Sequence, residues 1–84
     1  MKLDSKAAAL TFGLAWGATM LFVGAGNLIN GAYGQAFLDV MASVYPGYHA
    51  EGTFADAIVG ALYGTVDGAI GGLVLAWLYN RLSA

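Results

Sequence analysis

The sequence has no cysteine, one proline and one histidine, and it is poor in charge. Without cysteine it has no disulfide framework, thiolate metal site or thiol nucleophile, and its redox compartment is undetermined. Charged residues make up 10% of the chain, whereas a soluble domain carries roughly 25%. The net charge of −2 offers no basic surface, so we expect no nucleic-acid partner.

Apolar residues and glycine are what the chain has in abundance. Hydrophobic residues make up 60% of its 84 residues, and 13 residues are glycine. A chain of this length forms one domain, and a marginal one in water. Glycine this frequent, without a collagen repeat, is typical of helices that pack closely in lipid. The composition therefore indicates a membrane protein.

Two segments are long enough to cross a bilayer. Residues 7–29 contain no charged residue, and this run exceeds both the roughly 20 residues of a span and the roughly 7–15 of a signal-peptide core. Residues 54–79 form the second run, interrupted only by Asp56 and Asp67. We predict an all-α fold with a single membrane domain over 1–84, an integral membrane hairpin of two transmembrane helices.

The charged residues predict the orientation of this hairpin. Lys2, Lys6 and Arg81 lie near the two ends of the chain, while the connection carries Asp39 and Glu51 and no Lys or Arg. The positive-inside rule then places both termini in the cytoplasm and the connection outside.

The connection, residues 30–53, contains a predicted short helix over 35–45 that ends at the turn signal Pro46-Gly47. At about 100° per residue its apolar side chains share one face. Two interpretations are open: the helix lies on the outer surface of the bilayer, or it covers its own hairpin or a partner subunit. The residues of that face are Phe37, Val40, Met41, Val44 and Tyr45.

Glycines form one face on each predicted span, and such faces meet other helices because small residues let backbones approach. We expect Asp67 near Gly17 and Met20, and Asn27 near Asp56. Further copies or another subunit should pack alongside such a thin pair. The predicted helix-packing residues are Gly13, Gly17 and Gly24 in the first span, and Gly60, Gly64, Gly68, Gly71 and Gly72 in the second.

Three amide or carboxyl side chains fall inside the predicted spans: Asn27, Asp56 and Asp67. Asp67 is near the midplane, where a carboxylate costs roughly 2.5–3.5 kcal/mol and commonly marks a pathway or a buried polar contact. It is either a proton-binding or pore-lining acid, or a neutral group hydrogen-bonded to Tyr63, to Trp16 or to a carbonyl bared by glycine.

No catalytic constellation is visible, so we expect neither an enzyme nor a cofactor. The serines have no base positioned by a motif. His49 with Glu51 and Asp56 is the nearest approach to a metal site, but one histidine and two loosely spaced acids do not make one.

Several short motifs carry a family resemblance: Tyr45-Pro46-Gly47-Tyr48, Asp67-Gly68, Gly71-Gly72 and Ala76-Trp77-Leu78-Tyr79-Asn80, together with Trp16-Gly17 and the opening Met1-Lys2-Leu3. With them the chain resembles small two-span bacterial membrane proteins labelled as bacteriophage holins. The resemblance implies a protein that oligomerises in the bacterial inner membrane and opens lesions for lysis.

Three functions follow as hypotheses. The first is a holin-like pore or lesion former that assembles from copies of the chain. The alternative is a non-catalytic accessory subunit, packed by its glycine face onto a larger respiratory, photosynthetic or oxygenase complex; the weakly charged C-terminal end and the ordered-looking connection favour it. The third is a proton-conducting element that depends on Asp67 alone.

Overall fold

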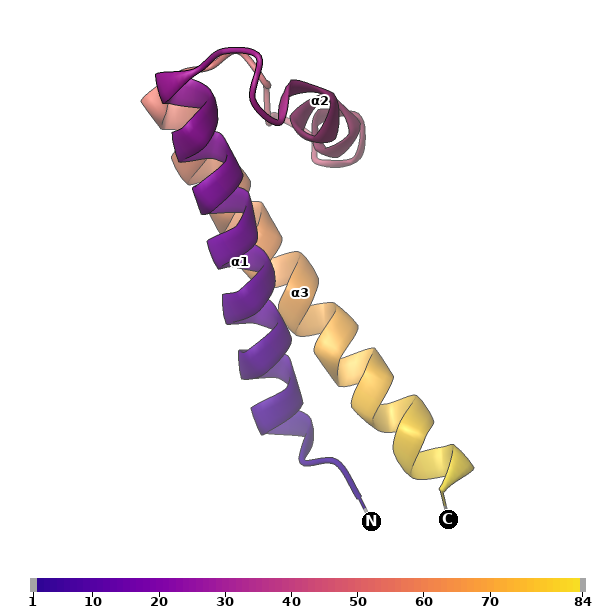
Figure 1. Cartoon of the computed structure of the whole chain (residues 1–84). Coiled ribbons are helices and arrows are strands. Elements are labelled where there is room, and N and C mark those ends of the chain that lie inside the picture. The colour runs from indigo at the N-terminus through magenta and orange to yellow at the C-terminus, as the bar shows by residue number, and fades with distance from the viewer. Residues whose placement is uncertain (1, 84) are drawn as a thin grey trace.

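The fold is a long two-helix hairpin with a short third helix in its connection (Figure 1). The computed structural model describes residues 2–83; Met1, part of the opening that resembles holins, and Ala84 lie outside them. The helices are α1 (Ser5–Ile29), α2 (Gln35–Val44) and α3 (Phe54–Leu82), and the described residues contain no strand. Helices α1 and α3 run side by side in opposite directions, so both chain ends lie at one end of the hairpin. The predicted all-helical hairpin is confirmed at this level.

Both long helices are long and apolar enough to cross a membrane. At about 1.5 Å per residue they measure roughly 37 and 43 Å, against about 30 Å of bilayer hydrocarbon. Helix α1 begins at Ser5, before its predicted start, and α3 continues to Leu82, beyond its predicted end. Polar side chains cap the N-termini of both helices. The carboxylate of Asp4 accepts from the Ala7 N–H at 3.1 Å, and the hydroxyl of Thr53 accepts from the Asp56 N–H at 3.1 Å.

The contact between α1 and α3 is made by small residues. A Cβ added to Gly13 would lie 2.9 Å from the Thr65 carbonyl oxygen, and one added to Gly64 would lie 2.7 Å from Met20 Cγ. Only glycine permits this approach. The buried residues of the two faces are Gly13, Gly17, Met20, Gly24 and Asn27 in α1, and Ala57, Gly60, Gly64, Gly72 and Ala76 in α3.

Two predicted interface glycines differ from the rest. Gly68 is half-buried and faces the Phe12 carbonyl. Gly71 is exposed, and a Cβ there would meet no atom within 4 Å. Gly71 therefore lies outside the contact between α1 and α3, because a helix of 3.6 residues per turn cannot direct both Gly71 and Gly72 at one neighbour.

The connection folds against its own hairpin. Gly34, at φ 66°, starts α2, and Gly47, at φ 82°, occupies the third position of a turn in which the Tyr48 N–H donates to the Tyr45 carbonyl at 3.1 Å. Proline followed by a glycine with positive φ is the pattern of a type II turn. Leu38, which is not part of the predicted apolar face, is buried in the cluster that contains Met20 of α1. Within that face, Phe37 and Met41 are partly buried against this cluster, whereas Val40 and Val44 are about 60% exposed. The predicted apolar face of this helix is thus divided, with one edge on the hairpin and the other outside.

Candidate functional site

One phenol links the middles of the two long helices. Tyr45, directly after α2, donates its hydroxyl proton to the Asp67 carboxylate at 2.7 Å and accepts from the Trp16 indole N–H at 2.9 Å. Trp16 lies near the middle of α1 and Asp67 near the middle of α3. We call Trp16, Tyr45 and Asp67 the central relay.

Aromatic packing fixes the position of Tyr45. Its ring stacks on Tyr63 of α3, with centroids 5.1 Å apart and planes 7° apart, and meets Tyr48 edge-on at 6.4 Å. The Tyr63 hydroxyl donates to the Pro46 carbonyl. Tyr45 and Tyr48 are 4% and 3% exposed, so neither is free to form part of an aromatic belt at the membrane surface. Together these contacts hold the turn in the crevice beside α3.

One of the two interpretations of Asp67 had it hydrogen-bonded to Tyr63, to Trp16 or to a carbonyl. The side-chain partner in the structure is a different residue, Tyr45, and Trp16 bonds Tyr45 instead. Tyr63 uses its hydroxyl on the turn. The sequence signal for Tyr45 was its place before Pro-Gly, which brings the chain back toward the helices.

Burial and hydrogen bonding keep the relay phenol protonated. Burial raises the pKa of Tyr45, and its hydrogen bond to the Asp67 carboxylate raises that pKa further, against a smaller lowering by the Trp16 N–H. Burial likewise raises the pKa of Tyr48, assisted by the negative charges of Asp56 and Asp39. Both phenols therefore stay protonated at neutral pH.

Asp67 is not enclosed by the hairpin. Its side chain is exposed in the single chain even though one carboxylate oxygen accepts from Tyr45. Gly71, four residues later, is exposed on the same side of α3. This face, which we call the Asp67–Gly71 surface, is the part of α3 where a carboxylate and an open backbone lie together.

Asn27 closes the connection at the other end of α1. It is 3% exposed, and its amide nitrogen donates to the carbonyl oxygens of Gly31 at 3.1 Å and Tyr33 at 2.9 Å and to the side chain of Gln35 at 3.1 Å. Its amide oxygen faces Gly52. Asn27 therefore binds the start of the connection.

Asp56 has a local capping role. Its carboxylate accepts from the Glu51 N–H at 3.2 Å, while its own N–H donates to Thr53. His49 is exposed on the same loop. Among residues 2–83, no three metal-ligating side chains gather at one point.

Comparison with protein-family models, with curated proteins and with solved structures found no match to this chain. Its fold and site therefore define it only as a class: a two-helix apolar hairpin whose connection is hydrogen-bonded to the middle of both helices.

Proposed function

We propose that this chain is a two-span protein of the bacterial inner membrane that assembles with copies of itself into a holin-type pore or lesion. The observation that supports assembly is the exposed carboxylate of Asp67 near the middle of α3. A carboxylate facing lipid at this depth costs roughly 2.5–3.5 kcal/mol. A neighbouring subunit or a water-filled lumen removes that cost, whereas lipid does not.

The Asp67–Gly71 surface is where we place the contact between copies. A Cβ at Gly71 would meet nothing within 4 Å in the single chain, so the backbone there is open to another helix. Gly72, by contrast, faces Ala8 and Ala9 of α1 inside the hairpin. Gly72 thus packs within the chain, and the neighbouring Gly71 packs between chains.

The decisive experiment is gentle extraction from the native membrane, followed by mass determination of the intact particle and of its constituents. The proposal expects a particle made only of this chain. Gly71→Leu should shift that particle toward the monomer while the unfolding of the hairpin in detergent stays unchanged. Ala18→Leu enlarges an exposed small residue on α1 and serves as the matched control. An unchanged particle mass in Gly71→Leu means that the contact lies elsewhere.

Pore opening requires its own measurement. Purified assemblies in liposomes should release a trapped dye, and the release should depend on oligomer formation. Asp67→Asn separates a general lesion from a proton pathway, because only a proton pathway needs a titratable group at this position. Dye-tight liposomes containing intact oligomers would contradict the pore.

A second candidate function, an accessory subunit of a larger membrane complex, is favoured by the apolar outward surface of the long helices. Apart from Asp67, the outward surface of the long helices is dominated by bulky apolar side chains such as Leu14 at 66%, Phe22 at 71% and Leu62 at 64% exposed. This surface suits burial against larger subunits as well as lipid. A particle of fixed stoichiometry that contains other proteins would establish this role, and a particle of this chain alone excludes it.

A further inference from the structure

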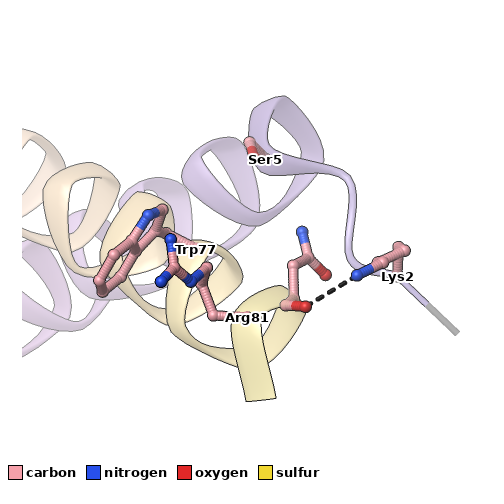
Figure 2. Close-up of a pocket in the computed structure, with 5 residues that line it drawn as sticks. Lys2, Ser5, Trp77 and Arg81 are labelled. Atoms are coloured by element: carbon pink, nitrogen blue, oxygen red, sulfur yellow. Dashed lines mark hydrogen bonds between the residues drawn. The ribbon is translucent and has the colours of Figure 1, made fainter. Parts of the chain in front are cut away.

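The chain ends bring basic residues together in a hollow between the start of α1 and the end of α3. This hollow, of about 350 Å³, is lined by Lys2, Ser5, Trp77, Asn80 and Arg81 (Figure 2). Lys2 and Arg81 are far apart in sequence and meet here only because the helices are antiparallel. We call these five residues the terminal pocket.

Hydrogen bonds hold the segment before α1 against the last turns of α3. The Asn80 side chain accepts from the Leu3 N–H at 2.7 Å and donates to the Leu3 carbonyl at 2.9 Å. The Lys2 ammonium donates to the Asn80 carbonyl at 2.7 Å. One of the three ammonium donors is used in this bond, and the others are directed elsewhere. Lys2 is therefore positioned beside α3 without losing its charge.

The Arg81 guanidinium contacts an aromatic ring and not an acidic side chain. Its guanidinium carbon lies 5.7 Å from the centre of the Trp77 ring (Figure 2). No side-chain carboxylate among residues 2–83 forms an ion pair with Lys2 or Arg81, and none lines the terminal pocket. The nearby carboxylate of Asp4 accepts from the Ala7 N–H in capping α1. The pocket is thus a basic site with unneutralised charge.

The cations lie at one end of the hairpin, and most of the acids lie at the other. Lys2, Lys6 and Arg81 lie at the terminal end with Asp4, whereas the connection end carries three acids and no cation: Asp39, Glu51 and Asp56. A tryptophan beside basic residues at the end of an apolar helix is the arrangement found at the headgroup level of a bilayer. Anionic lipids are concentrated in the cytoplasmic leaflet, the one that the positive-inside rule assigns to this end.

We propose that the terminal pocket binds the phosphate headgroup of an anionic phospholipid, with Lys2 and Arg81 as the charged ligands, the Ser5 hydroxyl as a donor and Trp77 against the glycerol region. This inference requires that α1 and α3 cross the membrane, as the proposed function states, but not that the chain forms a pore. The pocket is the right size for a small polar group, and guanidinium and ammonium groups are the usual ligands of phosphate.

The test uses the detergent-solubilised full chain titrated with dioleoyl phosphatidylglycerol or dioleoyl phosphatidylcholine, with bound lipids counted by native mass spectrometry. Each basic residue near an anionic headgroup contributes about a fivefold preference. The double variant Lys2→Gln and Arg81→Gln should therefore lower the preference for phosphatidylglycerol about thirtyfold. Lys6→Gln removes the same charge at the same end outside the pocket and should change it less than about twofold.

Other outcomes overturn the inference. If Lys6→Gln weakens phosphatidylglycerol binding as much as Lys2→Gln alone, the attraction is diffuse surface charge and not a built site. If inorganic phosphate displaces the lipid at equal concentration, the pocket binds soluble anions instead. Resistance of the chain to alkaline extraction from membranes tests the spans separately. A chain that resists extraction yet shows no lipid preference disproves the headgroup site alone, and an extractable chain disproves the membrane assignment.

Discussion

The two halves of the hairpin are held together by different means. In both halves α1 and α3 meet directly, with Gly24 against Ala57 in the connection half and Gly72 against the backbone of Ala8 in the terminal half. In the connection half a third segment packs beside them and forms a buried cluster of Met20, Leu38, Tyr45 and Tyr48. Large side chains therefore add to the packing of one half, whereas the other depends on close backbone contact alone.

This difference determines where each half is sensitive. A cluster of interlocking side chains depends on shape and on hydrogen bonds that reach across it, so loss of one group leaves another unpartnered. A backbone contact depends on the absence of side chains, so the addition of any atom separates the helices. The comparison yields four predictions.

The largest effect is expected from Gly72→Leu in the terminal half. A Cβ there would lie 2.8 Å from the Ala8 carbonyl carbon and 3.0 Å from Ala9 Cα. We expect destabilisation by about 1–3 kcal/mol or more, measured by thermal unfolding of the helical circular dichroism signal in detergent. Ala18→Leu, at an exposed small residue of α1, is the matched control and should stay within about 0.5 kcal/mol. Equal loss in both variants would show that the backbone contact is misplaced.

The next effect is expected from Tyr45→Phe in the connection half. This change removes one hydroxyl and leaves both the Trp16 N–H and the Asp67 carboxylate without their partner. The expected cost is about 1–3 kcal/mol in the same unfolding measurement. Tyr33→Phe removes the hydroxyl of a ring that is 44% exposed and should cost little. Equal unfolding stability of Tyr45→Phe and Tyr33→Phe would mean that the hydrogen bonds of the central relay contribute nothing to stability.

A smaller effect is expected from Thr53→Ala, which removes the cap of α3 where the connection ends. Loss of such a cap costs about 1 kcal/mol. Hydrogen exchange should speed up at the Asp56 amide, because Thr53 accepts from it, while the amides of α3 near Gly72 keep their protection. Uniform loss of protection along α3 would show that the two halves unfold together.

The smallest effect is expected from Asn80→Ala in the terminal half. This variant loses both hydrogen bonds to Leu3. Because these bonds hold only the segment before α1, their loss should release that segment locally and lower the stability of the hairpin by less than about 1 kcal/mol. Hydrogen exchange should become faster at the Leu3 amide and remain unchanged at the amides of α2. Faster exchange in α2 would mean that the chain ends and the connection are coupled, contrary to the division described above.

Sequence patterns predicted the features that depend on the periodicity of a single helix. Glycine spacing predicted which sides of α1 and α3 meet, since the period of a helix fixes which residues share a face. The short helix, predicted over 35–45, is observed at Gln35–Val44. Gly71 was misplaced within the hairpin because the helical wheel grouped it with Gly60, whereas at that height along α3 the adjacent Gly72 is the residue that faces α1.

The hydrogen bonds of the central relay could not be predicted from helical periodicity. Its geometry depends on how the connection returns toward the helices, which is fixed by Gly34 and Gly47 at positive φ and by the stacking of Tyr45 on Tyr63. None of these is a periodic feature. The same limit explains why Val40 and Val44 were grouped with Phe37, since a wheel cannot tell which part of a broad apolar arc the neighbour covers.

The central relay also has a consequence for the order of events during synthesis. Tyr45 forms hydrogen bonds with Trp16 of α1 and Asp67 of α3. Asp67 leaves the ribosome after Tyr45 does. A connection docked on α1 alone lacks the Asp67 acceptor of the Tyr45 hydroxyl and the Tyr63 ring on which Tyr45 stacks. We therefore expect the connection to be held firmly only after the middle of α3 has emerged. Residues 35–48 should be cleaved more readily by protease in chains arrested before Asp67 than in chains arrested well beyond it. The last helix to be synthesised thus sets the moment at which the connection is fixed in place.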